Sequence, residues 1–352
     1  MPDPPAASAL VSVIVLNHNG LRFLKTCFDS LLADSYPAVE LIMADNASTD
    51  DSLPFMREHY PSVTILETGG NIGYSGAYNL AVRKSTGTYA VLLNNDVEVT
   101  PGWLAPLIAE MEAQPDLAGC QPKLRHMEQR DSFEYAGASG GFMDRYGFPF
   151  LRGRILATIE KDTGQYDDGT DLFWASGAAL VVRREIFLRA GGLDDDFVHH
   201  MEEIDLCWRL HLMGYRLRVV PAALIYHYAG GTIKPDSYMK IYWNHRNSIF
   251  MLLRNYGPGR LLQVLPVRAL LDGIVMVKSL LSLDLKRLAA VPAAYLWLVF
   301  HLRMILRKRR QVQSQRIRSD REIDTYLYPR SMVVAYYLRG KKTFSELWPQ
   351  DR

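Results

Sequence analysis

Residues 11–16 read VSVIVL and are followed directly by the polar residues NHNG at 17–20. A short apolar run that stops at a turn signal is typical of a strand buried in a parallel sheet. Apolar residues then recur at helical spacing between Leu21 and Leu32. The same pattern continues, with strands predicted at 39–44, 62–66 and 89–93 and a helix at 79–84. This alternation predicts an α/β fold with a mostly parallel central sheet and helices on both faces.

Polar residues follow three of these predicted strands, at 17–19, 45–46 and 94–96. Parallel strands end at one common edge of their sheet, and ligands bind beyond that edge in such folds. One polar strand end is most often a helix cap or a turn. Three of them at one edge favour a binding site.

Residues 68–79, TGGNIGYSGAYN, form a glycine-rich stretch that opens a helix. Glycines let the backbone approach a ligand closely, but the spacing is neither that of a dinucleotide-binding loop nor that of a P-loop. Asp96 ends the next strand, with Asn94 two residues before it. A single carboxylate beside a neutral amide suits a Mg²⁺ or Mn²⁺ ion that is shared with a substrate diphosphate, and a simple turn is the alternative.

Residues 194–205 contain six carboxylates within twelve residues. Asp205 and Arg209 are spaced as an i,i+4 ion pair and are expected to be structural. Glu202 and Glu203 fall at the start of the same predicted helix, where a carboxylate can serve as a general base; a solvated acidic turn is the alternative. His227 follows a predicted strand at 224–226 and is a candidate metal ligand, although a lone histidine is usually structural.

Composition and charge divide the chain in two. Of its 352 residues 48% are apolar and 22% charged, which is a globular composition. Residues 1–253 contain 21 basic and 31 acidic residues, whereas residues 254–310 contain 11 basic and 2 acidic. The chain breaker NYGPG at 255–259 lies at this change. We therefore expect a catalytic domain at 1–255 and a basic, apolar helical region at 256–352.

The expected location of the protein depends on both ends of the chain and on its cysteines. Cys27, Cys120 and Cys207 are odd in number and lack metal-binding spacing, which indicates a reducing compartment. Residues 1–10 have no basic segment before an apolar run, so no secretory signal is expected. The longest uncharged run near the C-terminus is 288–302, shorter than the ~20 residues that span a bilayer.

The basic, apolar helices of residues 260–310 therefore predict a helix lying on an anionic membrane surface, with Arg303 and residues 307–310 as its basic cluster. Packing on the catalytic domain, or on a second subunit in a homo-oligomer, is the alternative. Binding of nucleic acid is disfavoured by the acidic catalytic part.

In their order and spacing these motifs resemble family 2 of the inverting glycosyltransferases, and most closely the bacterial rhamnosyltransferase-type branch. The resemblance covers residues 9–255 and includes WASGAALVVRREIF at 174–187. It implies the Rossmann-like glycosyltransferase A fold and transfer of a sugar from a UDP- or dTDP-linked donor to a hydroxyl of a glycan or lipid-linked acceptor. The branch suggests rhamnose as the sugar, a role in cell-surface polysaccharide assembly, and a peripheral position on the cytoplasmic face of the plasma membrane.

The resemblance assigns the donor side of the site to the polar strand ends. The residues that it places against the nucleotide and the donor are His18, Asn19, Asp45, Asn71, Gly73, Asn94 and Asn95. Asp96 takes the second position of the family's Asp-x-Asp motif and would bind Mg²⁺ or Mn²⁺ with the diphosphate. His227 takes the position of a histidine ligand found in some members. Asn94 replaces the first Asp of the motif, which weakens charge compensation at the metal.

The resemblance places the acceptor and the donor sugar against Trp174, Ser176 and Gly177. The pair Glu202-Glu203 stands where the family has Glu-Asp, so Glu203 is the expected base, one methylene longer than usual. A carboxylate with an ordinary pKa is ionised at pH 7 and can take the proton of the attacking hydroxyl. One such displacement inverts the anomeric centre.

Two other hypotheses make different demands on the sequence. A nucleotidyltransferase that makes nucleotide sugars needs a glycine-rich, basic phosphate-binding signature near the N-terminus, yet the first loop has no Lys or Arg before Arg22. A non-catalytic sugar-binding relative would lack the carboxylate that binds the metal or the one that acts as the base. In this chain both are present, as Asp96 and Glu203.

Overall fold

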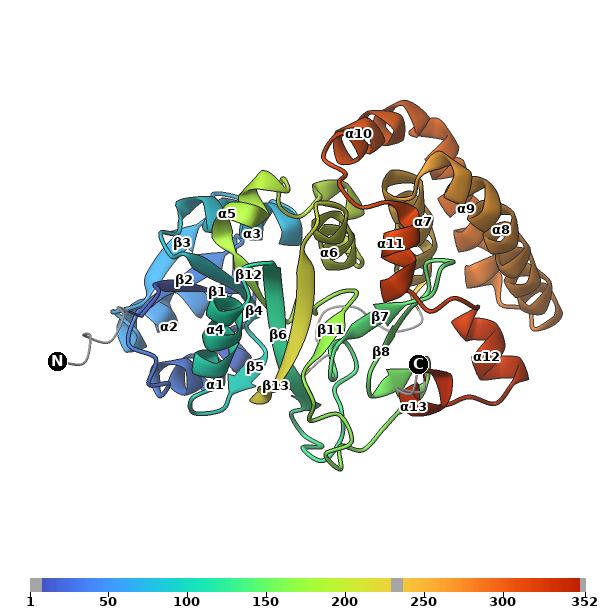
Figure 1. The fold of residues 1–352 in the computed structure, drawn as a ribbon. Helices are drawn as coiled ribbons and strands as arrows, with labels where there is room; N and C mark the ends of the chain where they lie inside the picture. Colours follow the sequence, from blue (N-terminus) through green and yellow to red (C-terminus); the bar gives the residue numbers. More distant parts are fainter. Residues whose placement is uncertain (1–7, 229–236, 349–352) are drawn as a thin grey trace.

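The computed structural model describes residues 8–228 and 237–348 (Figure 1). A nine-stranded central sheet runs through it. Its strands are β1 (Val11–Asn17), β2 (Val39–Asp45), β3 (Thr64–Glu67), β4 (Tyr89–Asn94), β5 (Val97–Val99), β6 (Leu117–His126), β11 (Thr170–Leu172), β12 (Ala179–Arg183) and β13 (Arg216–His227). They are arranged in the order β11-β13-β6-β12-β4-β1-β2-β3, with β5 paired to β13.

The predicted alternation of strands and helices accounts for one half of this sheet. Strands β3, β2, β1 and β4 are parallel neighbours, as predicted. In the other half, β12 is antiparallel to both β4 and β6, while β6 and β13 are parallel. The chain reaches β12 after a second, antiparallel sheet rather than through a crossover helix, so the complete sheet is mixed. The strands of that second sheet are β7 (Gly141–Met143), β8 (Pro149–Leu151), β9 (Arg154–Ile155) and β10 (Thr158–Ile159).

Helices cover both faces of the central sheet, as predicted. Alternate residues of β1 point to opposite sides: Val13 and Val15 pack with one group of helices, and Ile14 packs with the other. The first group is α1 (Leu21–Leu32), α2 (Ser52–His59) and α4 (Leu104–Ala113), and the second is α3 (Gly73–Lys84), α5 (Arg184–Arg189) and α6 (Glu202–Leu212).

Several boundaries differ from the sequence prediction, most of all at β13, which begins at Arg216, eight residues before the strand predicted at 224–226. Helix α3 begins at Gly73, six residues before the predicted start, because its first turns are interrupted by glycine and serine and show no regular apolar period. Strand β3 begins two residues late. Cys27, Cys120 and Cys207 are all buried and unpaired. Most of the segment 1–10, in which no secretory signal is expected, lies outside the described residues.

The C-terminal region is helical, as predicted. Its helices are α7 (Tyr238–Asn255), α8 (Pro258–Leu281), α9 (Leu285–Phe300), α10 (Leu302–Ser314), α11 (Asp320–Ile323), α12 (Met332–Leu338) and α13 (Phe344–Leu347). The predicted chain breaker separates α7 from α8. Leu298 and Ile305 nevertheless join one hydrophobic core with Trp208 of α6, so the division at residue 255 stays a prediction from composition.

No helix among the described residues is by itself long and apolar enough to cross a membrane. Only α9 and α10 taken together meet that measure, and a bend of 72° separates them.

Candidate active site

The ends of β1 and β2 meet as the parallel register predicts, with Asn17 opposite Asp45. The amide of Asn17 donates to Asp45 Oδ1 at 3.1 Å and accepts from Asn95 Nδ2 at 2.7 Å. The other oxygen of Asp45 accepts from the backbone N–H of Ser48 at 3.0 Å. The structure thus brings Asp45 and Asn95 into one network through Asn17. Contact of Asp45 with a nucleotide base stays a prediction.

His18 and Asn19 have different surroundings although they are adjacent. The side-chain oxygen of Asn19 accepts from the backbone N–H groups of Thr49 and Asp50, at 2.7 and 3.2 Å, and so holds the loop after β2. His18 is exposed, and its Nε2 lies 3.4 Å from Asn71 Nδ2. The imidazole and the amide therefore face one another across the loops that follow β1 and β3.

Asn46 connects these loops, and the sequence analysis did not single it out. Its amide group donates to Asn71 Oδ1 at 3.1 Å and to the carbonyl of Gly73 at 3.3 Å. Its side-chain oxygen accepts from the backbone N–H of Ile72 at 2.9 Å. Gly73 has a φ of +77°, a conformation that favours glycine. Asn46 directly follows Asp45 at the end of β2, and this position was the sequence signal from which its role could have been predicted.

Asp96 and His227 meet at the same edge of the sheet. Nε2 of His227 lies 3.0 Å from Asp96 Oδ1 and 3.4 Å from Asn94 Nδ2. On its other side, Nδ1 of His227 lies 3.3 Å from Oε1 of Glu134, a fully buried carboxylate. Glu134 was missed because it stands alone in a loop, with no motif around it.

These carboxylates change how His227 titrates. Burial alone would lower its pKa, but Asp96 and Glu134 outweigh that and raise the pKa of His227 to about 10. Burial likewise opposes ionisation of Asp96, yet the histidine holds the pKa of Asp96 below its usual range. The pair is therefore charged on both sides at neutral pH.

Glu202 and Glu203 begin helix α6, where Glu202 is buried and Glu203 is half-buried. Oε2 of each glutamate is buried and has no hydrogen-bond partner among the described residues. Burial, together with the neighbouring Glu203 carboxylate, raises the pKa of Glu202 to about 8. Burial raises the pKa of Glu203 to about 7. Two carboxyl groups at a helix start, each with one buried oxygen that has no partner, are poised to exchange a proton near neutral pH. The Asp205–Arg209 pair farther along the helix is structural, as predicted.

The loop between β11 and β12 joins the two ends of the site. The carbonyl of Ala178 accepts from the backbone N–H of Asn94 at 3.1 Å. At the neighbouring residue, a Cβ placed on Gly177 would lie 3.7 Å from Glu203 Cβ. The loop therefore contacts the end of β4 on one side and the start of α6 on the other.

Trp174 and Ser176 hold this loop from within. The indole N–H of Trp174, a buried residue, donates to the carbonyl of Phe142 at 2.8 Å. The backbone N–H of Ser176 donates to Gln121 Oε1 at 2.8 Å. The Trp174 ring thus supports the loop. Contact of Trp174, Ser176 and Gly177 with a sugar stays a prediction, and Gly177 is the one of the three that lies beside Glu203.

A pair of tyrosines on α3 closes the space between the two acidic groups. Tyr74 Oη donates to the carbonyl of Gly177 at 3.0 Å, and the ring of Tyr74 meets that of Tyr78 edge to face at 4.9 Å. Burial raises the pKa of Tyr74, and Glu202 and Glu203 raise it further. Both hydroxyls therefore stay protonated. Neither tyrosine was singled out from the sequence.

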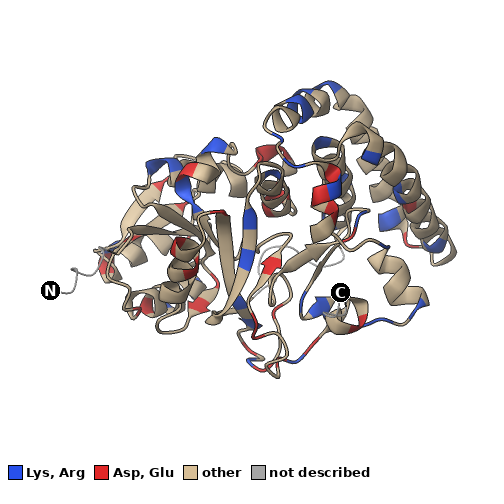
Figure 2. Ribbon diagram, in the orientation of Figure 1, with Lys and Arg blue, Asp and Glu red and all other residues tan. Residues whose placement is uncertain are grey.

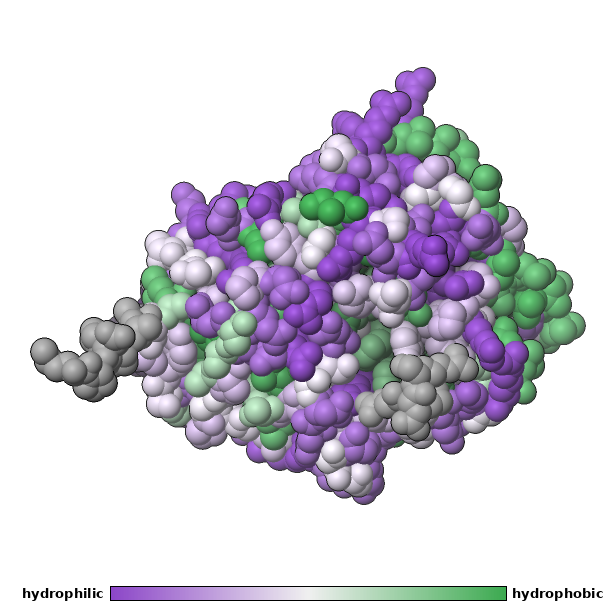
Figure 3. All heavy atoms as spheres, viewed as in Figure 1, coloured by the Kyte–Doolittle hydropathy of each residue, from purple (hydrophilic) through white to green (hydrophobic). Residues whose placement is uncertain are grey.

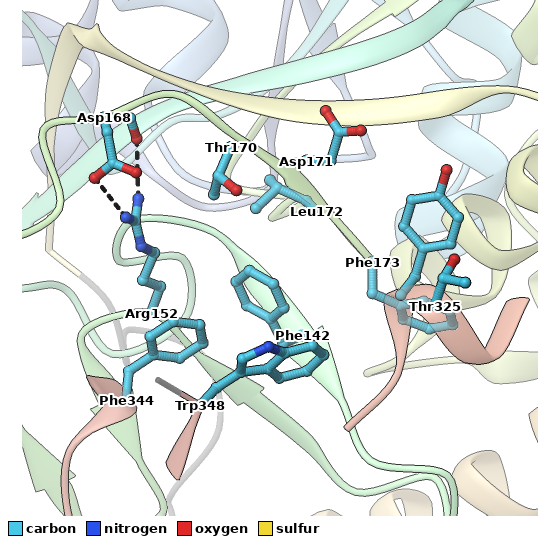
Figure 4. A pocket seen from close by; sticks show the side chains of 11 residues that line it. Phe142, Arg152, Asp168, Thr170, Asp171, Leu172, Phe173, Thr325, Phe344 and Trp348 are labelled. Carbon is cyan, nitrogen blue, oxygen red and sulfur yellow. Dashed lines mark hydrogen bonds and ion pairs between the residues drawn. The ribbon is translucent and has the colours of Figure 1, made fainter. Parts of the chain in front are cut away.

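The cavity shown in Figure 4 lies elsewhere, between the second sheet, β11 and the C-terminal helices. It has a volume of about 530 Å³ and is walled by the rings of Phe142, Phe344 and Trp348. The buried guanidinium of Arg152 is paired with Asp168 at its side. None of the predicted site residues lines it.

A family model, glycosyl transferase family 2, matches residues 12–188, just over half of the chain. The chain belongs to this family. Membership favours glycosyl transfer over nucleotidyl transfer and over a purely structural role. Glu202, Glu203 and His227 lie beyond the matched residues.

Curated relatives of this glycosyltransferase include two rhamnosyltransferases. The N-acetylglucosaminyl-diphospho-decaprenol L-rhamnosyltransferase of Mycobacterium tuberculosis is 26% identical over 289 residues, which is 77% of this chain and 92% of the relative. The rhamnosyltransferase WbbL of Escherichia coli is 28% identical over 229 residues, which is 62% of this chain and 84% of WbbL.

Solved structures support the glycosyltransferase A fold. GalNAc-T7 with UDP, GalNAc and Mn²⁺ superposes with a TM-score of 0.56 at 16% identity, over 72% of this chain and about half (49%) of that one. The mannosyltransferase PcManGT of Pyrobaculum calidifontis, with GDP-Man and Mn²⁺, gives 0.51 at 16% identity, over 99% of this chain and 89% of that one. The predicted fold class is confirmed.

Proposed function

We propose that this glycosyltransferase is a metal-dependent inverting enzyme that uses a nucleoside-diphosphate sugar as its donor. The observation that carries the proposal is the loop at 176–178, which is hydrogen-bonded to the end of β4 through Ala178 and lies beside the start of α6 at Gly177. A sugar bound against this loop would have the Asn94–Asp96 turn on one side and Glu203 on the other. Displacement from the face opposite the leaving diphosphate needs this arrangement.

Glu203 is the proposed base. Its buried, unpartnered oxygen is free to accept the proton of an acceptor hydroxyl. A pKa of about 7 lets the carboxylate take that proton and release it again near neutral pH. Burial raises the pKa of both glutamates, and because adjacent carboxylates repel each other, one of the two stays protonated when the other ionises.

Asp96 and His227 are the proposed protein ligands of Mg²⁺ or Mn²⁺. Their facing oxygen and nitrogen atoms suit either ion, which would replace the proton that His227 holds between them. Among the described residues no three His, Cys, Asp or Glu side chains form a complete cage, which agrees with an ion that is shared with a diphosphate. When bound, such an ion would neutralise charge on the departing diphosphate. His18, Asn71 and Gly73 line the adjoining loops where the nucleotide would lie.

The relatives support the finer assignments. The names of two of them specify rhamnose transfer, and the mycobacterial name specifies a diphospho-decaprenol-linked sugar. We therefore assign rhamnose from a UDP- or dTDP-linked donor, a glycan or lipid-linked acceptor of cell-surface polysaccharide, and a position on the cytoplasmic face of the plasma membrane.

A donor screen tests the proposal. The purified full-length chain is incubated with Mn²⁺ or Mg²⁺ and a panel of nucleotide sugars, and release of nucleoside diphosphate is measured. We expect release from one donor, abolished by EDTA and by Glu203→Gln. The matched control is Asp131→Asn, which changes an exposed ion pair with Lys161 and keeps activity. Absence of both turnover and nucleotide binding across the panel would refute the proposal.

A further inference from the structure

Helix α8 carries three polar residues on its buried face. Arg268 and Asp272 form a buried ion pair at 3.0 Å. Arg268 also donates to Ser248 Oγ of α7 at 2.5 Å, and Asp272 accepts from Tyr295 Oη of α9 at 2.8 Å. The buried residues of α8 are Val264, Arg268, Asp272 and Ser279, of which only the first is apolar.

The opposite face of α8 is apolar and exposed. Leu270, Ile274, Val277 and Leu281 recur every three or four residues and are 57–81% exposed. Residue 270 lies about 200° around the helix from residue 268, so this stripe points directly away from the buried pair. A water-facing helix has the reverse pattern. The distribution on α8 therefore matches a surrounding medium that is itself apolar.

The exposed apolar surface continues beyond α8. At the turn into α9, Leu283 and Leu285 are 76% and 72% exposed. Further along, the exposed apolar residues are Leu296, Val299, Phe300, Leu302 and Leu306, on α9 and the first turns of α10. Figure 3 shows these helices as the green edge on the right of the molecule. Continuous apolar patches of this kind mark interaction sites.

The charges around this surface are almost all positive. Lys278, Lys286, Arg303, Arg307 and Arg310 are exposed. The three arginines make no ion pair with any carboxylate that the structure describes. The only acids between 254 and 310 are Asp272, which is buried, and Asp284, which is paired with Arg287. Figure 2 shows blue segments and little red on the ribbon of α10.

We propose that the α8–α9 hairpin is a docking surface that lies in the interface of an anionic lipid bilayer. The exposed apolar stripe of α8 (Leu270, Ile274, Val277 and Leu281) and the turn at 281–285 would lie among the acyl chains. Arg303, Arg307 and Arg310 would contact lipid headgroups. A second copy of the chain is disfavoured as the occupant because it would bring the same positive rim against itself. The inference concerns this surface alone and does not depend on the reaction at the carboxylates.

Vesicle sedimentation of the full-length chain tests the inference. The probes are vesicles of phosphatidylcholine alone and vesicles with roughly a third phosphatidylglycerol. We expect binding to the anionic vesicles that weakens with salt. Leu270→Ser/Ile274→Ser/Leu281→Ser should weaken binding by about tenfold or more, since three large side chains lose their burial in lipid. Arg303→Gln/Arg307→Gln/Arg310→Gln should remove the preference for anionic vesicles.

The control variant Leu32→Ser/Ile317→Ser changes two apolar residues that are just as accessible, at 51% and 76% exposure, but lie outside the hairpin. It should bind like the parent chain. All the substituted side chains are exposed, so loss of folding is not expected, and circular dichroism checks this. Equal binding by Leu270→Ser/Ile274→Ser/Leu281→Ser and by the control would overturn the inference. It would also be overturned if the parent chain formed a stable dimer that did not bind vesicles, and if the triple serine variant were a monomer.

Discussion

Nε2 of His227 lies 3.0 Å from Oδ1 of Asp96, although 131 residues separate the two in the chain. The antiparallel pairing of β5 with β13 places His227 opposite Val97, the residue after Asp96. Glu134 stands on the far side of the imidazole, 3.3 Å from Nδ1. A histidine held between two carboxylates has its ring orientation set from both sides.

Asp96→Ala should abolish metal-dependent turnover, with a loss of about a hundredfold or more, because it removes the carboxylate that faces His227 at the proposed metal position. His227→Ala should cost less, since water can complete the ion's shell. Both are measured as nucleoside diphosphate release against Mn²⁺ concentration. Equal activity of Asp96→Ala and the parent chain at saturating Mn²⁺ would remove Asp96 from the metal site.

Glu134→Gln should lower the affinity for Mn²⁺ by about ten- to a hundredfold. The change removes a buried negative charge behind His227 and loosens the ring. Loss of that negative charge also weakens proton binding to the imidazole. The electrostatic attraction lost is larger for a divalent ion than for a proton, because the ion carries twice the charge. Calorimetric titration of Mn²⁺ in the presence of UDP measures the effect. Glu128→Gln, an exposed residue in the same loop, is the matched control, and equal affinities in the two variants would contradict the prediction.

Local patterns predict the parallel half of the fold well, because its strands are short apolar runs that end in polar turns. They also place Asp96, Glu203 and His227 on the correct elements. They do not reveal Glu134 or Tyr74. Glu134 reaches His227 only because β6 and β13 are paired, and Tyr74 reaches Gly177 only because α3 packs beside the loop before β12. Contacts between distant segments leave no local pattern.

The sequence analysis assigned residues 260–310 as a whole to a membrane surface, but it did not reveal which face of α8 points outward. Composition shows that a helix is apolar, but not which face its neighbours cover. The Arg268–Asp272 pair faces inward because Ser248 and Tyr295 supply partners for it. The leucines are then left outside.

Turnover should depend on pH with a single acidic limb near pH 7. An ordinary glutamate is ionised well below that pH and would give a flat profile from pH 6 to 8. Burial raises the pKa of Glu203 to about 7, so the base gains activity as pH rises through that value. Glu202→Gln should keep this limb if Glu203 is the base, because the amide is uncharged like a protonated Glu202 and leaves Glu203 buried. Glu203→Gln should lower kcat by about a hundredfold or more at every pH. A limb near pH 8 that Glu202→Gln abolishes would identify Glu202 as the base instead.

The same two carboxyl groups should make the fold less stable in alkaline solution. The unfolded chain releases their protons near pH 4.5, whereas the folded chain holds them up to about pH 7 and 8. The folded state therefore binds more protons in this window, and the free energy of unfolding falls as pH rises through it. Glu202→Gln should raise Tm by a few degrees at pH 8.5 and leave it unchanged at pH 4. Thermal melts at both pH values measure this, and an equal shift at the two would contradict it.

Gly177→Ala should slow turnover by about tenfold, because the added Cβ would lie 2.6 Å from Tyr74 Oη and must displace the ring beside Glu203. The clash is with one removable oxygen atom. Tyr74→Phe deletes that atom, so the double variant Gly177→Ala/Tyr74→Phe should be more active than Gly177→Ala alone, even though Tyr74→Phe by itself loses a hydrogen bond. Gly259→Ala, where a Cβ meets no atom within 4 Å, is the control and should leave kcat unchanged. The two single variants, the double variant and the control are compared by kcat and donor KM with the donor found in the screen. A double variant no faster than Gly177→Ala would show that Tyr74 does not transmit the effect of the methyl group to the site.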